Sequence, residues 1–446
     1  MVTPAVIHGL PVEILIKIFV HCIFGYDFPA LKLYHLHPSD PRRTLTYLKY
    51  PTPLSFLLSH VCSLWRDVAL SSPLLWTLLE TPADGRCTSS KPIINLLRLC
   101  ISRSGNLPLS IYVCSTLEDG DGSQGFMKAI ADHLHRVENM TLTFWRTDTP
   151  FTRIYGDAPS LRILKLESIP ESMTNLKFPF SSCPMLRHLQ WPHSSSLLGS
   201  DIHIIPWAQL THLRLGFVST RQTISLFSYC PRLIEIHYKI SSSLLPDPGP
   251  GPDHRCKHKS LRKLVFIFEP GTNINAIMNY ILLPKLTFLQ LEIEHTLLRD
   301  DPLSTDCLKN FLELSECRLL HLELTHLNYH SGELQSILQT PVCSGLTTLK
   351  ITAHLKRADI ELTGDLLTRL TCNGASTTAE VICPDLQTMF FMNYTPSSTH
   401  GGVGKMVASR FKYGDLEHFA FYPLECPAED KKILRSYANA GYDVRC

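Results

Sequence analysis

The feature that most constrains this chain is a short segment, LxxLxL, that recurs from the middle of the sequence onwards. Six consecutive copies are separated by steps of 25, 24, 23, 28 and 25 residues, and they begin at Leu161, Leu186, Leu210, Leu233, Leu261 and Leu286. A variant, VENMTL, begins at Val137, and four later copies begin at Leu319, Leu346, Leu386 and Leu416. This period is typical of a leucine-rich repeat, whose units are about 20 to 29 residues long.

The residue pattern of each copy predicts a short β-strand. Its fourth and sixth positions are apolar and its third and fifth are mostly polar, so alternate side chains point to opposite faces. One such strand cannot bury its apolar face, but stacked copies make a continuous core. We therefore predict an α/β solenoid with parallel strands on its concave side and helices, such as Arg221–Cys230, on its convex side.

Three copies are introduced by Cys-Pro, at Cys183, Cys230 and Cys383. We expect the proline to end a helix there and the cysteine to pack as a small buried hydrophobe. The spacing loosens in a Pro/Gly-rich stretch at 241–260 and again where the steps lengthen to 33 and 40 residues, the latter around 371–381. Such insertions either carry binding residues or are surface loops without a role.

The first hundred residues follow a different pattern. The segment Leu10–Phe24 is apolar except for Glu13, Lys17 and His21, which recur every four residues as one polar stripe of a helix. After a loosely patterned stretch comes a second apolar segment, in which one stripe at helical spacing contains Leu57, Val61, Leu64 and Val68. A set this small cannot bury all of its own apolar side chains, which predicts a partner surface.

The sequences LPVEILIKIF and VCSLWRDVALSSPLLWTLL resemble an F-box, a three-helix module that docks on the Skp-family adaptor of cullin-based ubiquitin ligases. The matching residues are Leu10, Pro11, Glu13, Ile14, Ile18, Phe19, Val61, Cys62, Trp65, Arg66, Ala69, Pro73, Leu75 and Trp76. The chain departs from the family in the long gap between the two halves. Long insertions there are found in the F-box proteins of mushroom-forming fungi, which the chain also resembles at Ile94–Val113.

The resemblance implies a domain organisation. We expect an F-box-like module at 1–80 with an insertion at about 25–52, a linker helix at 81–106 and a leucine-rich-repeat solenoid at 107–446. By similarity, the residues that bind the adaptor or support its binding surface are Leu10, Pro11, Ile14, Ile18, Val61, Trp65, Leu75 and Trp76. For Ile14, Ile18 and Val61 the alternative is packing inside the module, while Val61, with Leu64 and Val68, is expected in its core.

The implied function is that of a substrate-recognition adaptor in a Skp-cullin-F-box ubiquitin ligase, a receptor without catalytic activity. The alternative is a leucine-rich-repeat protein-binding scaffold that acts outside any ligase. Residues projecting from the central strands would bind the target protein, and we single out His212, Arg214, His237, Lys239, Lys263 and Phe288. Their mildly basic and partly apolar character favours a target with some acidic character, against the alternative of a merely solvated face.

Histidines recur at the third position of several repeats, among them His188 and His212 in consecutive copies. These two either form a metal pair or pH-sensitive contact or are simply solvated. Fifteen cysteines include no CxxC pair, and the cluster DHRCKH at 253–258 lacks a fourth ligand, so we expect no metal. The stretch THGGVGKM at 399–406 lacks the first glycine and the Ser or Thr of a phosphate-binding loop.

Charge and composition exclude other classes. Forty-two basic and 40 acidic residues give a net charge of +2, which offers no general attraction for nucleic acid or an anionic membrane. We expect no secretory signal, no membrane span and no cofactor, and a location in the cytoplasm, the nucleus or both. The catalytic patterns HExxH and GxSxG are absent from the sequence.

Overall fold

The computed structural model divides the chain into two compact units, Met1–Pro206 and Trp207–Cys446. The structure describes residues 9–24, 54–80, 90–115, 127–144, 154–167, 177–192, 197, 203–241, 255–294, 303–327, 329–354, 361–372, 381–396, 401–423 and 425–446. Most of the sequence insertions, at 25–52, 242–254 and 373–380, lie outside these residues.

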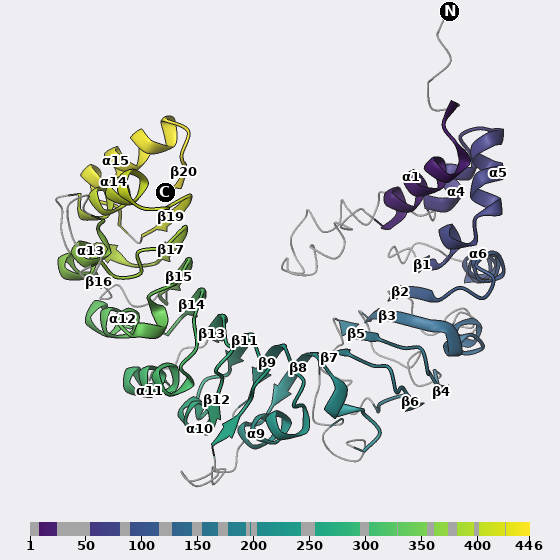
Figure 1. The fold of residues 1–446 in the computed structure, drawn as a ribbon, viewed down its shortest axis with the longest axis horizontal. Coiled ribbons are helices and arrows are strands. Elements are labelled where there is room, and N and C mark those ends of the chain that lie inside the picture. Colours follow the sequence, from purple (N-terminus) through teal and green to yellow (C-terminus); the bar gives the residue numbers. More distant parts are fainter. Residues whose placement is uncertain are drawn as a thin grey trace, which may run out of the picture. The chain divides into compact units, whose positions relative to one another are not determined.

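Unit 1 begins with a helical module, whose elements contact one another and are coloured purple to blue in Figure 1. These elements are α1 (Val12–Phe24), α4 (Leu54–Ser59), α5 (Ser63–Ser71) and the 3-10 helix η2 (Pro73–Trp76). The predicted continuous stripe across the second segment is wrong, because α4 ends at Ser59 and α5 starts only at Ser63. The Cys62 Sγ accepts a hydrogen bond from the backbone N–H of Trp65 at 3.5 Å and so caps the new helix.

The rest of unit 1 is a parallel sheet with strands in the order β1-β2-β3-β5-β7. Its strands are β1 (Leu78–Glu80), β2 (Leu109–Ser115), β3 (Val137–Phe144), β5 (Ile163–Glu167) and β7 (His188–Trp191). Helix α6 (Ser90–Arg103) lies within the predicted linker range, and the 3-10 helix η3 (Leu134–Arg136) precedes β3. Helices were expected between these strands, but the described residues between β3 and β7 contain instead a short two-stranded sheet of β4 (Gly156–Asp157) and β6 (Phe180–Ser182).

The described residues of unit 2 contain nine further parallel strands in the order β8-β9-β11-β13-β14-β15-β17-β19-β20. They are β8 (His212–Val218), β9 (Glu235–Ile240), β11 (Lys263–Phe268), β13 (Phe288–Ile293), β14 (His321–Thr325), β15 (Thr348–Thr352), β17 (Thr388–Met392), β19 (His418–Tyr422) and β20 (Asp443–Arg445). From β8 to β19 each strand starts at the third position of its LxxLxL copy. The prediction of an α/β fold built on parallel strands is therefore confirmed.

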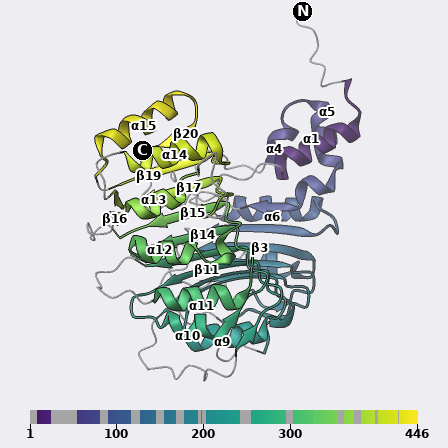
Figure 2. The same cartoon turned by 60° about the vertical axis from the view of Figure 1, so that its left-hand side comes forward.

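Helices cover one side of the unit 2 sheet, and the strands line the other, which we call the inner face (Figures 1 and 2). The helices are α9 (Thr220–Tyr229), α10 (Ile274–Tyr280), α11 (Thr305–Ser315), α12 (Ser331–Leu338), α13 (Gly364–Leu370), α14 (Gly402–Tyr413) and α15 (Ala428–Asn439). Short elements join them: η6 (Trp207–Gln209), η7 (Pro341–Cys343), the pair β10 (Cys256–Lys257) and β12 (Ile281–Leu282), and the pair β16 (Glu361–Leu362) and β18 (Thr395–Pro396).

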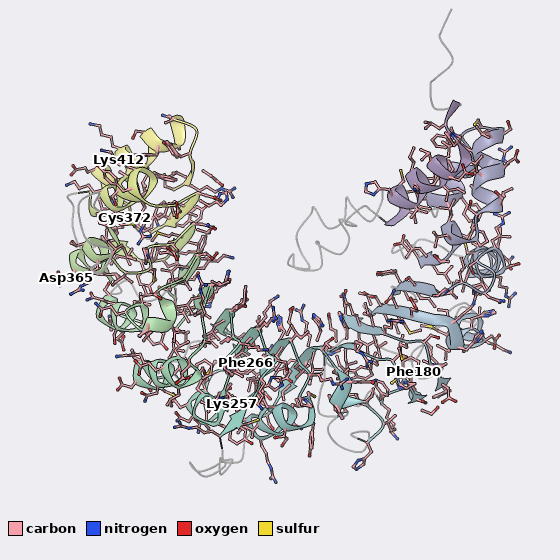
Figure 3. The ribbon with its side chains drawn as sticks, viewed as in Figure 1. Phe180, Lys257, Phe266, Asp365, Cys372 and Lys412 are labelled. Atoms are coloured by element: carbon pink, nitrogen blue, oxygen red, sulfur yellow. The ribbon has the colours of Figure 1, made fainter. Side chains whose placement is uncertain are left out.

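The core of unit 2 lies between the strands and these helices. In β9, β14, β15 and β17 every second side chain is buried and its neighbours are half-buried, as the pattern predicts. Phe266, fully buried, lies in this layer (Figure 3). The N-cap Ser219 shows how a helix begins here, because its hydroxyl accepts from the Gln222 N–H while the Gln222 side chain accepts from the Ser219 N–H.

The three Cys-Pro cysteines are buried, as predicted. Burial raises the pKa of the Cys183 and Cys230 thiols to about 12 and raises that of Cys383 as well. Cys230 closes α9, so the proline there follows a helix as expected. At Cys183 the expectation is wrong, because the preceding element is the short strand β6.

Candidate functional site

The helical module has a core of its own. Leu15 and Phe19 of α1 are buried, α1 contacts α4, α5 and η2, and Trp76 of η2 is fully buried. The Trp76 indole N–H donates to the Ala69 carbonyl at 2.8 Å, which ties η2 to α5. The Phe56 ring of α4 meets Trp76 edge-on, with centroids 4.9 Å apart. These contacts within the module therefore give it a packed core that does not depend on a bound partner.

This core leaves large apolar side chains outside it. They come from all four elements and from the turn between α4 and α5: Val12, Ile14, Leu57, Val61, Leu70 and Leu74. Val61 is the most exposed of them at 60%. Six exposed large apolar side chains on so small a module favour an interaction with a partner.

The structure places the predicted adaptor-binding residues in two groups. Pro11, Ile14 and Val61 are exposed, and Leu10, Ile18 and Trp65 are half-buried. Leu75 and Trp76 are buried in the module, so they support its surface rather than form it. The expectation that Val61 belongs to the internal core is wrong, whereas Val68 is buried. Sequence reasoning missed Leu74, which the 3-10 turn exposes in place of Leu75.

Trp65 connects the surface of the module to its core. Its ring lies against Phe19, with centroids 4.7 Å apart. Its indole nitrogen is buried and has no hydrogen-bond partner among the described residues. The next residue, Arg66, donates from Nε to the Ser59 carbonyl at 3.0 Å and so fixes α5 on the end of α4.

A joint holds the module to the sheet within unit 1. The guanidinium of Arg103, at the end of α6, lies 4.4 Å from the centre of the Trp76 ring and 5.9 Å from that of Phe56. Directly after Trp76 the chain enters β1, where Leu78 pairs with Ser110 of β2. The helical module and the first strands are thus one packed body.

The six predicted target-binding residues lie on the inner face of unit 2. They occupy neighbouring positions in the strand register: Glu235 of β9 lies between His212 of β8 and Lys263 of β11, and Arg214 lies beside His237. Phe288 follows Lys263 in the same row. Arg214 is exposed and the other five are half-buried. The structure therefore brings all six together on one face.

The two lysines of this set are ion-paired. Lys263 Nζ lies 2.8 Å from a carboxylate oxygen of Glu235, and Lys239 Nζ lies 2.8 Å from one of Glu294. Lys239 also lies over the ring of Phe217, at 4.5 Å from its centre. The basic character predicted from the sequence is thus balanced at both lysines by carboxylates, one from the adjacent strand β9 and one from the end of β13, two strands away from Lys239.

Phe288 forms part of a stack rather than an open apolar patch. The His321 ring lies parallel to it with centroids 4.0 Å apart, and Lys263 Nζ lies 5.2 Å from its centre. His321 in turn lies 3.4 Å from Glu323, which Lys350 approaches to 3.5 Å. Burial alone would raise the pKa of Glu323, but the hydrogen bond from His321 and the charge of Lys350 lower it below its ordinary value.

The cluster DHRCKH has a structural role at its last residue. His258 is buried, and its Nε2–H donates to the Cys230 carbonyl at 2.9 Å. Burial lowers the pKa of His258, and its Nδ1 has no partner in the described part of the chain. His254 lies outside the described residues. Among those that are described, no group of three or more His, Cys, Asp or Glu side chains is placed to hold a metal.

The glycines of THGGVGKM pack two helices together. Gly401 has a left-handed backbone, with φ of 72°, and begins α14. The Gly404 N–H donates to the buried Asp430 carboxylate at 2.7 Å, so a side chain of α15 occupies the helix N-terminus. A Cβ at Gly404 would lie 2.8 Å from that of Ile433, so the close approach of α14 and α15 requires glycine.

Sequence reasoning missed one more part of the inner face, at β17 and β19. The projecting side chains there include Phe390 and Met392 of β17 and Tyr422 of β19. The signal was present in the segment TMFFM, in which two of the three positions that point away from the core, Phe390 and Met392, are apolar. A strand with one face in solvent normally alternates.

A scan against protein-family models finds no match to this chain, and a search of curated proteins finds none either. No helix within the described ranges is long and apolar enough to cross a membrane. The fold and the two surfaces together define a class: an α/β protein of repeated parallel strands that carries an N-terminal helical module.

Proposed function

We propose that this chain is the substrate-recognition subunit of a Skp-cullin-F-box ubiquitin ligase, with no catalytic activity of its own. In this proposal the helical module is an F-box that binds a Skp-family adaptor and through it a cullin. The strands form a leucine-rich-repeat solenoid whose inner face binds the target protein. The protein would act in the cytoplasm or the nucleus, where these ligases work.

One observation carries the proposal: a module that has a complete small core still exposes several large apolar side chains. Fully burying one such side chain contributes about 1.5 to 3 kcal/mol. The cost of association is estimated at about 4 to 15 kcal/mol. Burial of four or five such side chains outweighs only the lower part of this range, and that part applies when the surface is already formed before binding. The Trp76 hydrogen bond and the Phe19–Trp65 contact support such preformation.

The packing of the module against α6 also supports this role. A module whose core is held by a neighbouring helix loses less conformational freedom when it docks on a partner. The contacts of Arg103 with Trp76 and Phe56 fix the module on the first strands of unit 1.

The test is co-purification with a Skp-family adaptor and measurement of the dissociation constant by biolayer interferometry. Val61→Asp and Ile14→Asp place a charge on the exposed apolar surface and should each weaken binding at least about tenfold, which is about 1.4 kcal/mol. Leu99→Asp is the matched control, because Leu99 is an exposed apolar residue on α6, outside the module. Replacing Leu10 and Pro11 with alanine tests the segment before α1.

The three aspartate variants should keep the melting temperature of the wild type, since Ile14, Val61 and Leu99 are exposed. Equal adaptor binding by wild type and both aspartate variants would reject the proposed surface. If no Skp-family adaptor binds while target proteins are still captured, the chain is instead a scaffold that acts outside a ligase.

A further inference from the structure

The inner face of unit 2 changes character at β17 and β19. From β8 to β15 most projecting side chains are charged or polar, whereas Phe390, Met392, Ala420 and Tyr422 are apolar or aromatic. Their strand neighbours Met389 and Phe391 already fill the core, so this second set is not needed for folding. The rings of Phe390 and Tyr422 lie 5.9 Å apart, and Tyr422 is 41% exposed. We call these four residues the apolar patch.

A cation stands at each end of the apolar patch. The strand register puts Lys350 of β15 opposite Phe390, Phe390 opposite Ala420, and Ala420 opposite Arg445 of β20. One row across four strands therefore reads lysine, phenylalanine, alanine, arginine. Neighbouring strands lie about 4.8 Å apart, so the row is about 14 Å long.

Both cations are available to a bound carboxylate. The Lys350 side chain is 40% exposed and lies 3.5 Å from Glu323, and that of Arg445 is 69% exposed and lies 3.2 Å from Asp443. Surface ion pairs of this kind contribute little and exchange partners readily. Each of these carboxylates also has a histidine nearby, so it keeps a partner when the cation binds elsewhere: His321 lies 3.4 Å from Glu323, and His418 lies 2.9 Å from Asp443.

We propose that the apolar patch binds an extended target segment in which one apolar side chain is flanked, two residues away on each side, by an acidic one. An extended chain rises about 3.3 Å per residue, and alternate side chains point the same way. Residues i and i+4 are thus about 13 Å apart, which matches the distance between Lys350 and Arg445 along the row. Residue i+2 then meets the apolar patch.

This assignment names the class of target sequence and, as a target site, rests on the function proposed above. Peptide binding itself needs no adaptor and is measured without one. A failure of adaptor docking therefore leaves the peptide result standing, and a failure of the peptide rejects this assignment alone.

The experiment is fluorescence anisotropy of the full chain with a labelled nine-residue peptide. The peptide has glutamate at its third and seventh positions, leucine at its fifth, and serine or glycine elsewhere. We expect saturable binding in the range of about 10 to 100 μM. Replacing the leucine with serine, or both glutamates with lysine, should weaken binding at least about tenfold.

Variants of the protein locate the site. Tyr422→Ser should weaken binding about tenfold. The double variant with Lys350→Glu and Arg445→Glu should lose the glutamate peptide and gain the lysine peptide. Lys412→Glu is the matched control, because Lys412 of α14 is an exposed lysine that also lies beside an aromatic ring, 4.7 Å from the centre of Tyr413, on the helix-covered side of the sheet. It should bind the glutamate peptide as the wild type does.

Several results would overturn the assignment. They are the absence of peptide binding, equal binding by the Tyr422→Ser variant, failure of the charge exchange, and loss of binding in Lys412→Glu, which would show an effect of net charge alone. Light scattering tests the alternative that a second copy of the chain occupies the apolar patch. A wild-type dimer that dissociates in Tyr422→Ser would show this and overturn the assignment.

Discussion

Replacing the buried Arg410 should destabilise unit 2 more than any surface change. Arg410 of α14 is completely buried, and it donates to three backbone carbonyls: Nε to Leu370 at 2.5 Å, Nη2 to Ile382 at 2.8 Å and Nη1 to Cys383 at 3.0 Å. Leu370 ends α13, and the other two carbonyls come after the next gap in the described chain. One side chain thus holds two separated stretches of backbone.

The size of the effect follows from these three bonds. Arg410→Met fills similar space but leaves three buried carbonyl oxygens without this donor, at about 1 to 3 kcal/mol each. Removing a guanidinium whose pKa burial has already lowered relieves part of that cost, because its desolvation was unfavourable. We expect a net loss of about 3 to 5 kcal/mol in the free energy of unfolding.

Urea unfolding followed by far-UV circular dichroism measures this loss. Arg410→Lys should also cost at least about 2 kcal/mol, because a single ammonium cannot span three carbonyls in the way a planar guanidinium does. Arg435→Met is the control, since Arg435 is an exposed arginine of α15. A loss of less than about 1 kcal/mol in Arg410→Met would refute the reasoning.

Three further outcomes are expected from the buried groups. The pKa of His258 is lowered in the fold, so the unfolded chain takes up its proton first and stability should fall below about pH 6.5; urea midpoints at pH 7.5 and 5.5 should differ more in wild type than in His258→Gln. Burial raises the pKa of the half-buried Glu80 to about 7, so the fold favours its neutral form and the stability that this adds is lost as pH rises through 7. Glu80→Gln should therefore raise the free energy of unfolding by about 1 to 2 kcal/mol at pH 8 but change it little at pH 4.5, measured by the same assay. Gly404→Ala should cost about 1 to 3 kcal/mol through its clash with Ile433, and Ile433→Ala should reduce that cost in a double-mutant cycle of thermal unfolding.

The repeat spacing was sufficient to locate the strands because each copy has a fixed relation between sequence and face. In the large sheet, the third position of LxxLxL marks the first residue of each strand from β5 to β19. The same rule puts Glu235 beside Lys263, so their ion pair was within reach of the sequence. Lys239 and Glu294 were not, because their pair joins β9 to the end of β13 across an intervening strand.

In the helical module, apolar spacing alone gave the wrong side-chain directions. A continuous helix would place Leu57, Val61 and Val68 on one stripe, but Cys62 restarts the helix and turns Val61 outward. In PLLW the 3-10 turn exposes Leu74 and buries Leu75, a choice that three apolar residues in a row do not encode. Which apolar side chains are exposed here depends on where each helix or turn begins and ends, and the spacing of apolar residues does not give these positions.

Two buried arginines hold the ends of helices through backbone oxygens. Arg136, just before β3, donates to the carbonyls of Ile101 and Leu107 around the end of α6, at 3.0 and 3.1 Å, and Arg410 does the same for Leu370 at the end of α13. In both cases a cation from the next strand–helix unit meets the negative end of a helix and satisfies carbonyls that have no intrahelical donor. Because the partners are backbone oxygens, the contact places no demand on side chains in the preceding unit. Substitution of the side chains at those carbonyls should therefore leave both contacts in place.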